Sequence, residues 1–160
     1  MEKRLIPYEA ATSIGNGNVL VLAPHPDDEV FGCGGAILRQ IAEGGCVHVD
    51  IATDGAYLGS TQASPEYGSV RQDESRQAAK LLGYGSPEFW SLEDRGLEYG
   101  EDLILRIGSA ISASAADCVF APSLHEMHPD HRALGMAALE AVRRSSTTRL
   151  IMYEVGVPML

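Results

Sequence analysis

Short apolar runs alternate along this chain with stretches in which apolar residues recur every three or four positions. The runs are typical of buried β-strands, and the longer periodicity is typical of amphipathic helices. The predicted strands cover residues 19–23, 47–53, 88–92, 118–121 and 149–155, and the predicted helices cover residues 28–42, 70–82, 103–111 and 129–144. This alternation predicts an α/β fold, a Rossmann-like, mostly parallel sheet with helices on both faces.

Two segments fall outside this alternation. Residues 1–17 form a predicted N-terminal arm, and residues 18–160 then make a single domain, which suits a chain of 160 residues. Residues 56–69 are polar and show no periodicity, so we expect a long loop after the second strand, where substrate-binding segments often lie. Ser69 is then the expected cap of the second helix.

The composition is that of an acidic, compact domain. A formal net charge of −10 argues against nucleic acid or an anionic membrane as a partner. No apolar stretch has the length of a signal peptide or of a membrane-spanning helix. Cys33, Cys46 and Cys118 lie in apolar patterns, so we expect small buried residues of a protein in the reducing cytoplasm.

The first predicted strand ends in a segment that is unusually rich in ionisable side chains. Its residues are Ala23-Pro24-His25-Pro26-Asp27-Asp28-Glu29. One imidazole and three carboxylates at a strand's end cost solvation free energy and add nothing to a core, which indicates a functional role. In parallel sheets, ligands bind outside the carboxyl ends of the strands.

A second such segment follows the fourth predicted strand. Its residues are His125-Glu126-Met127-His128-Pro129-Asp130-His131-Arg132. Pro129 suits the first position of a helix, which makes His128 the expected cap and places His131 one turn further on. Residues three apart share a helix face, so the two imidazoles can converge on one point.

Together the two segments predict a metal site. Two histidines, one carboxylate and an open position are typical of a catalytic zinc site, in which the ion lowers the pKa of its water toward ~7. Asp27 and Asp28 are neighbours that cannot face the same way, so one binds the metal and the other is a general base. Of His128 and His131, one binds while the other steadies an oxyanion or protonates a leaving amine. Spacing alone leaves both choices open.

Both segments resemble the signature motifs of the PIG-L/LmbE-like zinc-dependent N-deacetylases, which remove N-acetyl groups from amino-sugar conjugates. The resemblance extends over nearly the whole chain. Further matching segments are Phe31-Gly32-Cys33-Gly34-Gly35, Thr53-Asp54-Gly55, Arg71 with Glu74, Leu82-Gly83 and Met152-Tyr153-Glu154.

The resemblance assigns roles to the residues of the two motifs. Carried over by position, it implies that His25, Asp28 and His131 bind the metal, with Zn²⁺ expected and another divalent ion left open. It also implies that Asp27 is the general base and that His128 is the acid or the oxyanion partner.

Three residues outside these roles are further candidates. The resemblance implies that Arg71 and Asp94 contact the sugar. The local alternatives are that Arg71 pairs with Glu74 or Ser75 on a solvated helix face and that Asp94 is a plain turn residue. Glu126, just before the second motif, is expected to orient a ligand imidazole.

We therefore expect a metal-dependent hydrolase that removes an N-acetyl group from an amino sugar or glycoconjugate. The alternatives are an amidase on another sugar-linked amide and a non-catalytic, metal-stabilised binding module. A nucleotide-binding Rossmann domain is disfavoured, because residues 32–35 lie inside a helix pattern and lack the fingerprint spacing. Family members usually continue beyond the last strand, so we expect this chain to lack the C-terminal part or to complete its pocket in a homo-oligomer.

Overall fold

The computed structural model describes residues 11–57, 59, 64–145 and 147–156. Within them the chain forms a five-stranded sheet in the order β3-β2-β1-β4-β5, in which all neighbouring strands are parallel. Its elements are β1 (Asn18–Ala23), α1 (Asp28–Ala42), β2 (Cys46–Thr53), α2 (Pro65–Leu82), β3 (Glu88–Leu92), α3 (Glu101–Ser114), β4 (Cys118–Pro122), α4 (Pro129–Arg144) and β5 (Arg149–Tyr153). The predicted α/β fold is confirmed.

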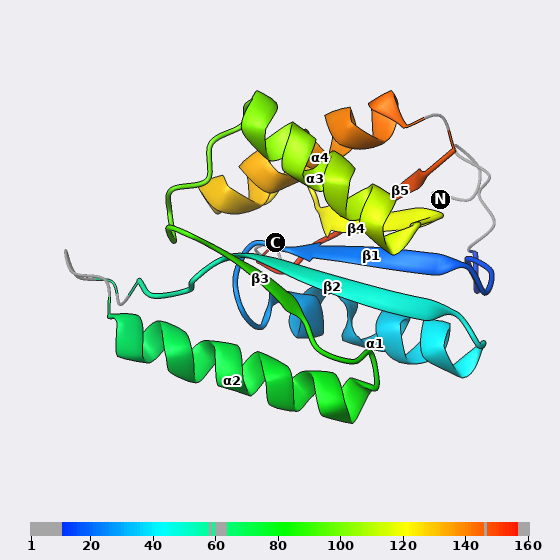
Figure 1. Ribbon diagram of the computed structural model, residues 1–160, viewed down its shortest axis with the longest axis horizontal. Coiled ribbons are helices and arrows are strands. Elements are labelled where there is room, and N and C mark those ends of the chain that lie inside the picture. The colour runs from blue at the N-terminus through cyan, green and yellow to red at the C-terminus, as the bar shows by residue number, and fades with distance from the viewer. Residues whose placement is uncertain (1–10, 58, 60–63, 146, 157–160) are drawn as a thin grey trace, which may run out of the picture.

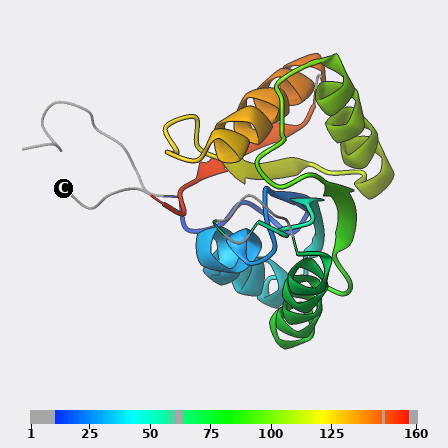
Figure 2. The ribbon, with the colours of Figure 1, turned by 90° about the vertical axis from the view of Figure 1, so that its left-hand side faces the viewer.

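The helices cover both faces of the sheet, α1 and α2 on one side and α3 and α4 on the other (Figures 1 and 2). Each face has its own core, because side chains along a strand alternate in direction. Leu20 and Leu22 of β1 pack in the core beneath α3 and α4, and Val19 and Val21 pack in the core beneath α1. This two-sided burial explains why β1 is an uninterrupted apolar run.

Helix α2 corrects the sequence-based prediction, since it begins at Pro65 and not after Ser69. Ser64 is the cap, and its hydroxyl accepts the backbone N–H of Tyr67 at 3.3 Å. Proline suits the first helical position because its missing N–H has no partner there in any helix. The predicted loop after β2 is correspondingly shorter, and residues 58 and 60–63 of it lie outside the described residues.

The cysteine prediction is confirmed for Cys33 and Cys118, which are buried, and is wrong for Cys46, which is exposed. Cys46 is the first residue of β2, and its side chain is exposed to solvent at that end of the strand. Residues 1–10 of the predicted N-terminal arm lie outside the described residues. In the part of the chain that the structure describes, no helix combines the length and apolar character needed to cross a membrane.

The strand order brings the two motifs together. From β1 the chain moves outward through β2 to β3, and α3 then returns it to β4, which lies on the other side of β1. The carboxyl ends of β1 and β4 are therefore neighbours at the point where the direction of winding reverses. In open α/β sheets this is where ligands bind.

Candidate active site

The first motif forms the turn between β1 and α1. Asp28 begins the helix, and its carboxylate accepts the backbone N–H of His25 at 3.0 Å, which closes the turn. Asp27 precedes the helix with φ 101°, in the left-handed region, and its side chain makes no capping hydrogen bond. That backbone conformation costs a residue other than glycine roughly 1–2 kcal/mol. Asp27 and Asp28 consequently point in different directions, as expected for neighbours with different roles.

The second motif forms the entry to α4. His128 is the cap of this helix, and its Nδ1 accepts the backbone N–H of Asp130 at 3.2 Å. Pro129 occupies the first turn, and His131 follows, with its Nε2 3.2 Å from Oδ2 of Asp28 in the first motif. Because Nδ1 of His128 accepts a hydrogen bond, the proton of the neutral ring is on Nε2.

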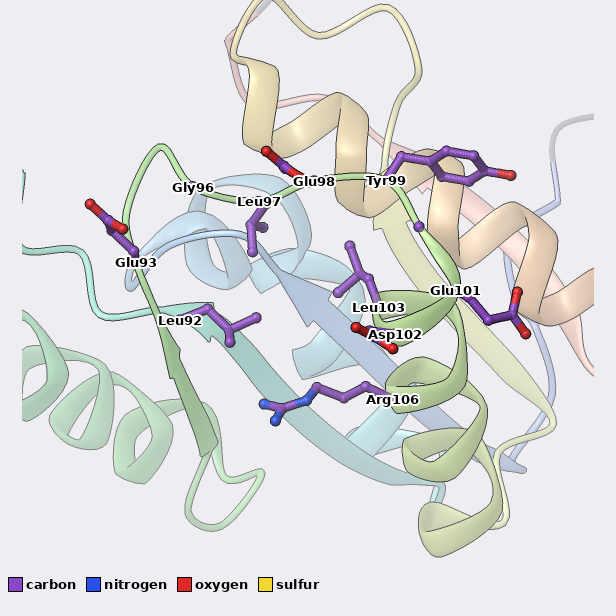
Figure 3. Close-up of a pocket in the computed structure, with 11 residues that line it drawn as sticks. Leu92, Glu93, Gly96, Leu97, Glu98, Tyr99, Glu101, Asp102, Leu103 and Arg106 are labelled. Atoms are coloured by element: carbon purple, nitrogen blue, oxygen red, sulfur yellow. The ribbon is translucent and has the colours of Figure 1, made fainter.

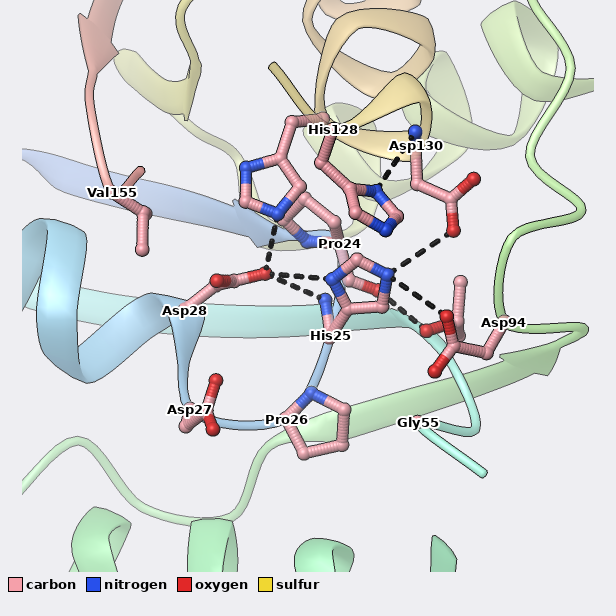
Figure 4. A network of polar contacts seen from close by, with 12 residues as sticks. Pro24, His25, Pro26, Asp27, Asp28, Gly55, Asp94, His128, Asp130 and Val155 are labelled. Atoms are coloured by element: carbon pink, nitrogen blue, oxygen red, sulfur yellow. Dashed lines mark hydrogen bonds and ion pairs between the residues drawn. The ribbon is translucent and has the colours of Figure 1, made fainter. Parts of the chain in front are cut away.

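Three predicted ligands converge at the switch point (Figure 4). Oδ2 of Asp28 lies 3.1 Å from Nδ1 of His25 and 3.2 Å from Nε2 of His131. Ligands at zinc bond lengths in a tetrahedron are roughly 3.3 Å apart. Each of these two spacings is that of neighbouring ligands on one small cation, and we call His25, Asp28 and His131 the candidate metal centre.

A second set of donors includes His128 instead of Asp28. Nitrogen atoms of His25, His128 and His131 lie within 4.8 Å of one another. The carboxylate of Asp28, however, contacts the imidazoles of both His25 and His131. Nδ1 of His128 already accepts the backbone N–H of Asp130. The contacts favour the set with Asp28 and leave Nε2 of His128 beside it.

Two carboxylates lie behind His25. Its Nε2 is 3.1 Å from Oδ2 of Asp130 and 3.3 Å from Oδ1 of Asp94. Asp130 also accepts the backbone N–H groups of Arg95 at 2.7 Å and Leu97 at 3.3 Å, which fastens the segment after β3 to α4. A carboxylate on the far nitrogen of a ligand histidine fixes the ring and strengthens the ligand.

Asp130 is the residue of this site for which sequence reasoning gave no role. It stands inside the second motif and is fully buried. Asp94 lies 3.3 Å from Nε2 of His25 and accepts the backbone N–H of Tyr57 at 3.3 Å, and its expected contact with a sugar stays a prediction. It is thus more than a plain turn residue in this structure.

The buried carboxylates around His25 favour a positive charge at this place. Burial opposes a charge on His25, yet hydrogen bonds to Asp130, Asp28 and Asp94 raise its pKa to about 11. Burial likewise opposes ionisation of Asp28, but hydrogen bonds from His131 and His25 lower its pKa. The three carboxylates within 3.3 Å of His25 outnumber the single charge that its ring can carry. A divalent cation would supply positive charge at the same place, so the residues present fit a metal.

Asp27 lies beside this centre, with the Arg71 guanidinium against it. Arg71 donates to Oδ2 of Asp27 at 3.2 Å and to the carbonyls of Pro26 at 2.6 Å and Gly55 at 3.1 Å. The expected alternative, a pair with Glu74 or Ser75, is not what the structure shows. Burial raises the pKa of Asp27, and Arg71 offsets part of that rise. About half of the Asp27 side chain, 52%, is exposed, so it is accessible to substrate and water.

Glu126 lies near the remaining nitrogen of His131. Its Oε2 is 3.7 Å from Nδ1 of His131, which is buried and has no hydrogen-bond partner among the described residues. The same carboxylate accepts the backbone N–H groups of Val155 and Gly156 beyond β5. The expected role of Glu126 in orienting His131 stays a prediction, with the carboxylate placed where a small shift would complete the bond.

A separate cleft of about 450 Å³ lies between the end of β3 and the start of α3 (Figure 3). Its charged residues are Glu93, Glu98, Glu101, Asp102 and Arg106. No imidazole or thiol lines it among the described residues, so the metal-binding and acid–base chemistry gathers at the switch point instead.

Fold and site define an α/β protein with a two-histidine, one-aspartate candidate metal centre at the switch point. The chain belongs to the family described as PIG-L: GlcNAc-PI de-N-acetylase, which it matches over residues 20–142.

Similar proteins agree with this family. The chain is 32% identical over 130 residues to diacetylchitobiose deacetylase of Thermococcus kodakarensis, covering 78% of this chain and 48% of that protein. It is 30% identical over 138 residues to probable N-acetyl-α-D-glucosaminyl L-malate deacetylase 2 of Bacillus cereus, covering 79% and 61%. The solved structure of N,N′-diacetylchitobiose deacetylase from Pyrococcus horikoshii superposes with a TM-score of 0.73 at 35% identity, covering 80% and 50%. The chain thus spans about half to three fifths of the length of these curated relatives.

Proposed function

We propose that this protein is a zinc-dependent N-deacetylase that hydrolyses the acetamide of an amino sugar or glycoconjugate. One observation carries the proposal: His25, Asp28 and His131 converge. The carboxylate of Asp27, which is not one of the proposed ligands, lies beside them. The similar deacetylases act on N-acetylglucosamine units, which supports the choice of substrate class.

The proposed metal ligands are His25, Asp28 and His131. When bound, a zinc ion would lower the pKa of a water molecule and polarise the amide carbonyl of the substrate. Two neutral imidazoles and one carboxylate leave the ion with a net positive charge, which favours zinc chemistry of this kind. Asp130 and Asp94 would keep His25 oriented through its far nitrogen.

Asp27 is the proposed general base and acid. It accepts a proton from the attacking water as the new C–O bond forms at the acetyl carbon. It then delivers that proton to the amine nitrogen as the C–N bond breaks, so acetate and a free amino sugar leave. Its raised pKa supports both halves of this transfer.

His128 is the proposed oxyanion partner. Burial lowers the pKa of His128, which favours the neutral ring. Nδ1 accepts the Asp130 amide, so Nε2–H is the group left to donate to the developing oxyanion. This arrangement supports hydrogen-bond donation by a neutral His128 and assigns the amine proton to Asp27.

Arg71 has a proposed double task. Its Nη2 holds the carboxylate of Asp27 and the carbonyl of Pro26, and its Nη1 donates to the carbonyl of Gly55. The N–H groups of the guanidinium that these contacts leave over would bind the sugar. Sugar hydroxyls are suitable acceptors for such donors. Free thiols at Cys33, Cys46 and Cys118 support the expected location in a reducing cytoplasm.

The test is acetate release from N,N′-diacetylchitobiose and from N-acetylglucosaminyl malate, with metal-free protein and after addition of Zn²⁺. We expect turnover that requires metal and falls about 10²–10⁴-fold in Asp27→Asn. The matched control is Asp73→Asn, an exposed aspartate on α2, which should keep turnover within about twofold. Equal rates with and without metal, or an active Asp27→Asn, would contradict the proposal.

A further inference from the structure

The first motif contains a third carboxylate, Glu29, that the candidate metal centre does not use. It lies in the first turn of α1 and is fully buried. Its Oε2 accepts the backbone N–H of Asp27 at 3.0 Å, and its Oε1 accepts the hydroxyl of Tyr84 at 3.4 Å. The Ser75 hydroxyl faces the same carboxylate without a hydrogen bond of ordinary length.

A carboxylate in this position is costly for the fold. Glu29 is 0% exposed, and a charged carboxylate there has lost its water. An apolar side chain of similar volume would fill the space between α1, α2 and Tyr84 without that penalty. We therefore attribute the acid at this position to its hydrogen bond with the backbone N–H of Asp27.

Asp27 needs such a hold because of its backbone. With φ 101° it occupies a conformation that glycine tolerates and other residues avoid, yet glycine would remove the carboxylate. Glu29 fixes the peptide N–H of Asp27, while Arg71 fixes its Oδ2 at 3.2 Å. The two contacts restrain the backbone and the side chain of the same residue from opposite sides.

We propose that Glu29 is a positioning residue that holds Asp27 in the left-handed conformation and so aims its carboxylate at the reacting water. This inference rests on the proposed function, in which Asp27 transfers the proton. Glu29 acts through its acceptor oxygen on the Asp27 N–H, and it touches neither metal nor substrate.

Three substitutions separate this role from a structural one. Glu29→Met removes the acceptor, and Glu29→Asp keeps the charge but is one methylene too short to reach the N–H. Glu29→Gln keeps a carbonyl oxygen for the N–H and turns its amide toward the Tyr84 oxygen. We expect Met and Asp to lower kcat about 10–100-fold with KM and zinc content within about twofold, and Gln to retain kcat within about threefold. Loss of zinc, a change confined to KM, or an inactive but folded Gln variant would overturn the proposal.

A double-mutant cycle tests whether Glu29 works through Asp27. In an Asp27→Asn background, Glu29→Met should change the residual rate by less than about twofold. An equal fractional loss in both backgrounds would overturn the proposal. If Glu29→Met fails to fold, the same cycle with Glu29→Asp gives the same decision.

Hydrogen exchange at the Asp27 amide tests the contact without turnover. We expect the amide to be protected in the wild type and in Glu29→Gln, and to exchange at least about tenfold faster in Glu29→Met and Glu29→Asp. Unchanged exchange in these variants would overturn the proposal. A wild type that releases no acetate but shows the expected exchange pattern would contradict the proposed function and leave the positioning contact established.

Discussion

Two clusters of charged side chains join separate parts of this fold, and they differ in exposure and in balance. The candidate metal centre links the ends of β1 and β4, and its residues His25, Asp28 and His131 are at most 7% exposed. The other cluster links α3 to α4 on the surface, where Arg144 lies 2.6 Å from Glu101 and 2.9 Å from Glu140.

The surface cluster is balanced within itself. Arg143 and Arg144 neutralise Glu101 and Glu140, water screens the pairs, and such pairs stabilise a fold only weakly. At the switch point, carboxylates surround imidazoles that carry no permanent charge. A buried excess of acid is unfavourable without a cation. Buried carboxylates without enough positive charge therefore indicate a site, whereas the number of ion pairs does not.

Removing a metal ligand should have the largest effect. His131→Ala is expected to reduce acetate release below about 1% of the wild type and to abolish stoichiometric zinc binding, because two donors hold zinc poorly. Zinc content by elemental analysis and acetate assays measure both. His125→Ala, an exposed histidine of the same loop, is the matched control and should behave as the wild type. A zinc-replete, active His131→Ala would remove the distinction between the two clusters.

Asp130→Asn should have the next largest effect. The amide keeps the shape of the side chain but weakens the hold on Nε2 of His25. Zinc affinity is expected to fall about 10–100-fold, as is usual for a carboxylate behind a ligand histidine. Competition with a chromophoric chelator measures it, with Asp73→Asn as control. Unchanged affinity would show that Asp130 only fastens the segment after β3.

A half-buried acid outside both clusters should give a smaller, pH-dependent effect. Burial raises the pKa of Asp50, which accepts the Trp90 indole N–H at 3.2 Å, from 3.8 to about 6. The folded state therefore holds this proton more tightly, so the contribution of Asp50 to stability is present below pH 4 and is lost as the pH rises through 6.

Asp50→Asn keeps an acceptor for Trp90 and removes this titration. The free energy of unfolding of the variant relative to the wild type should rise by about 1 kcal/mol between pH 4 and pH 7. Urea unfolding at four pH values measures the difference. A difference independent of pH would contradict the raised pKa of Asp50.

The surface cluster should show the smallest effect. Arg144→Ala is expected to change Tm by no more than about 3 °C, and the change should shrink further in 1 M NaCl. Calorimetry at both salt concentrations measures it. A large, salt-insensitive loss would place this cluster on the same footing as the buried one.

The sequence predicted the sheet well because its central strands are buried on both faces. Val19–Ala23 is apolar throughout, so no choice of register was needed to recognise it. The start of α2 was missed because Ser64, Pro65 and Glu66 lie in a polar stretch without apolar periodicity. The signal there is local capping chemistry, a serine followed by proline.

The site was predictable only where its chemistry is local in sequence. Spacing within each motif predicted a metal site but left open which aspartate and which second histidine bind. The family resemblance implied Asp28 and His131. The role of Asp130 depends on His25, which is 105 residues away, and on Arg95, which is 35 away. The left-handed backbone of Asp27 is likewise fixed by Glu29 and Arg71 and has no signature in the sequence.

Anomalous scattering at the zinc edge, from crystals of the zinc-loaded protein, tests the proposed metal ligands most directly. We expect a single strong peak in contact with His25, Asp28 and His131. Asp27 should lie outside the coordination sphere, and solvent should fill the remaining position. A peak bound by His128 in place of Asp28, a fourth protein ligand, or no peak at the switch point would contradict this prediction.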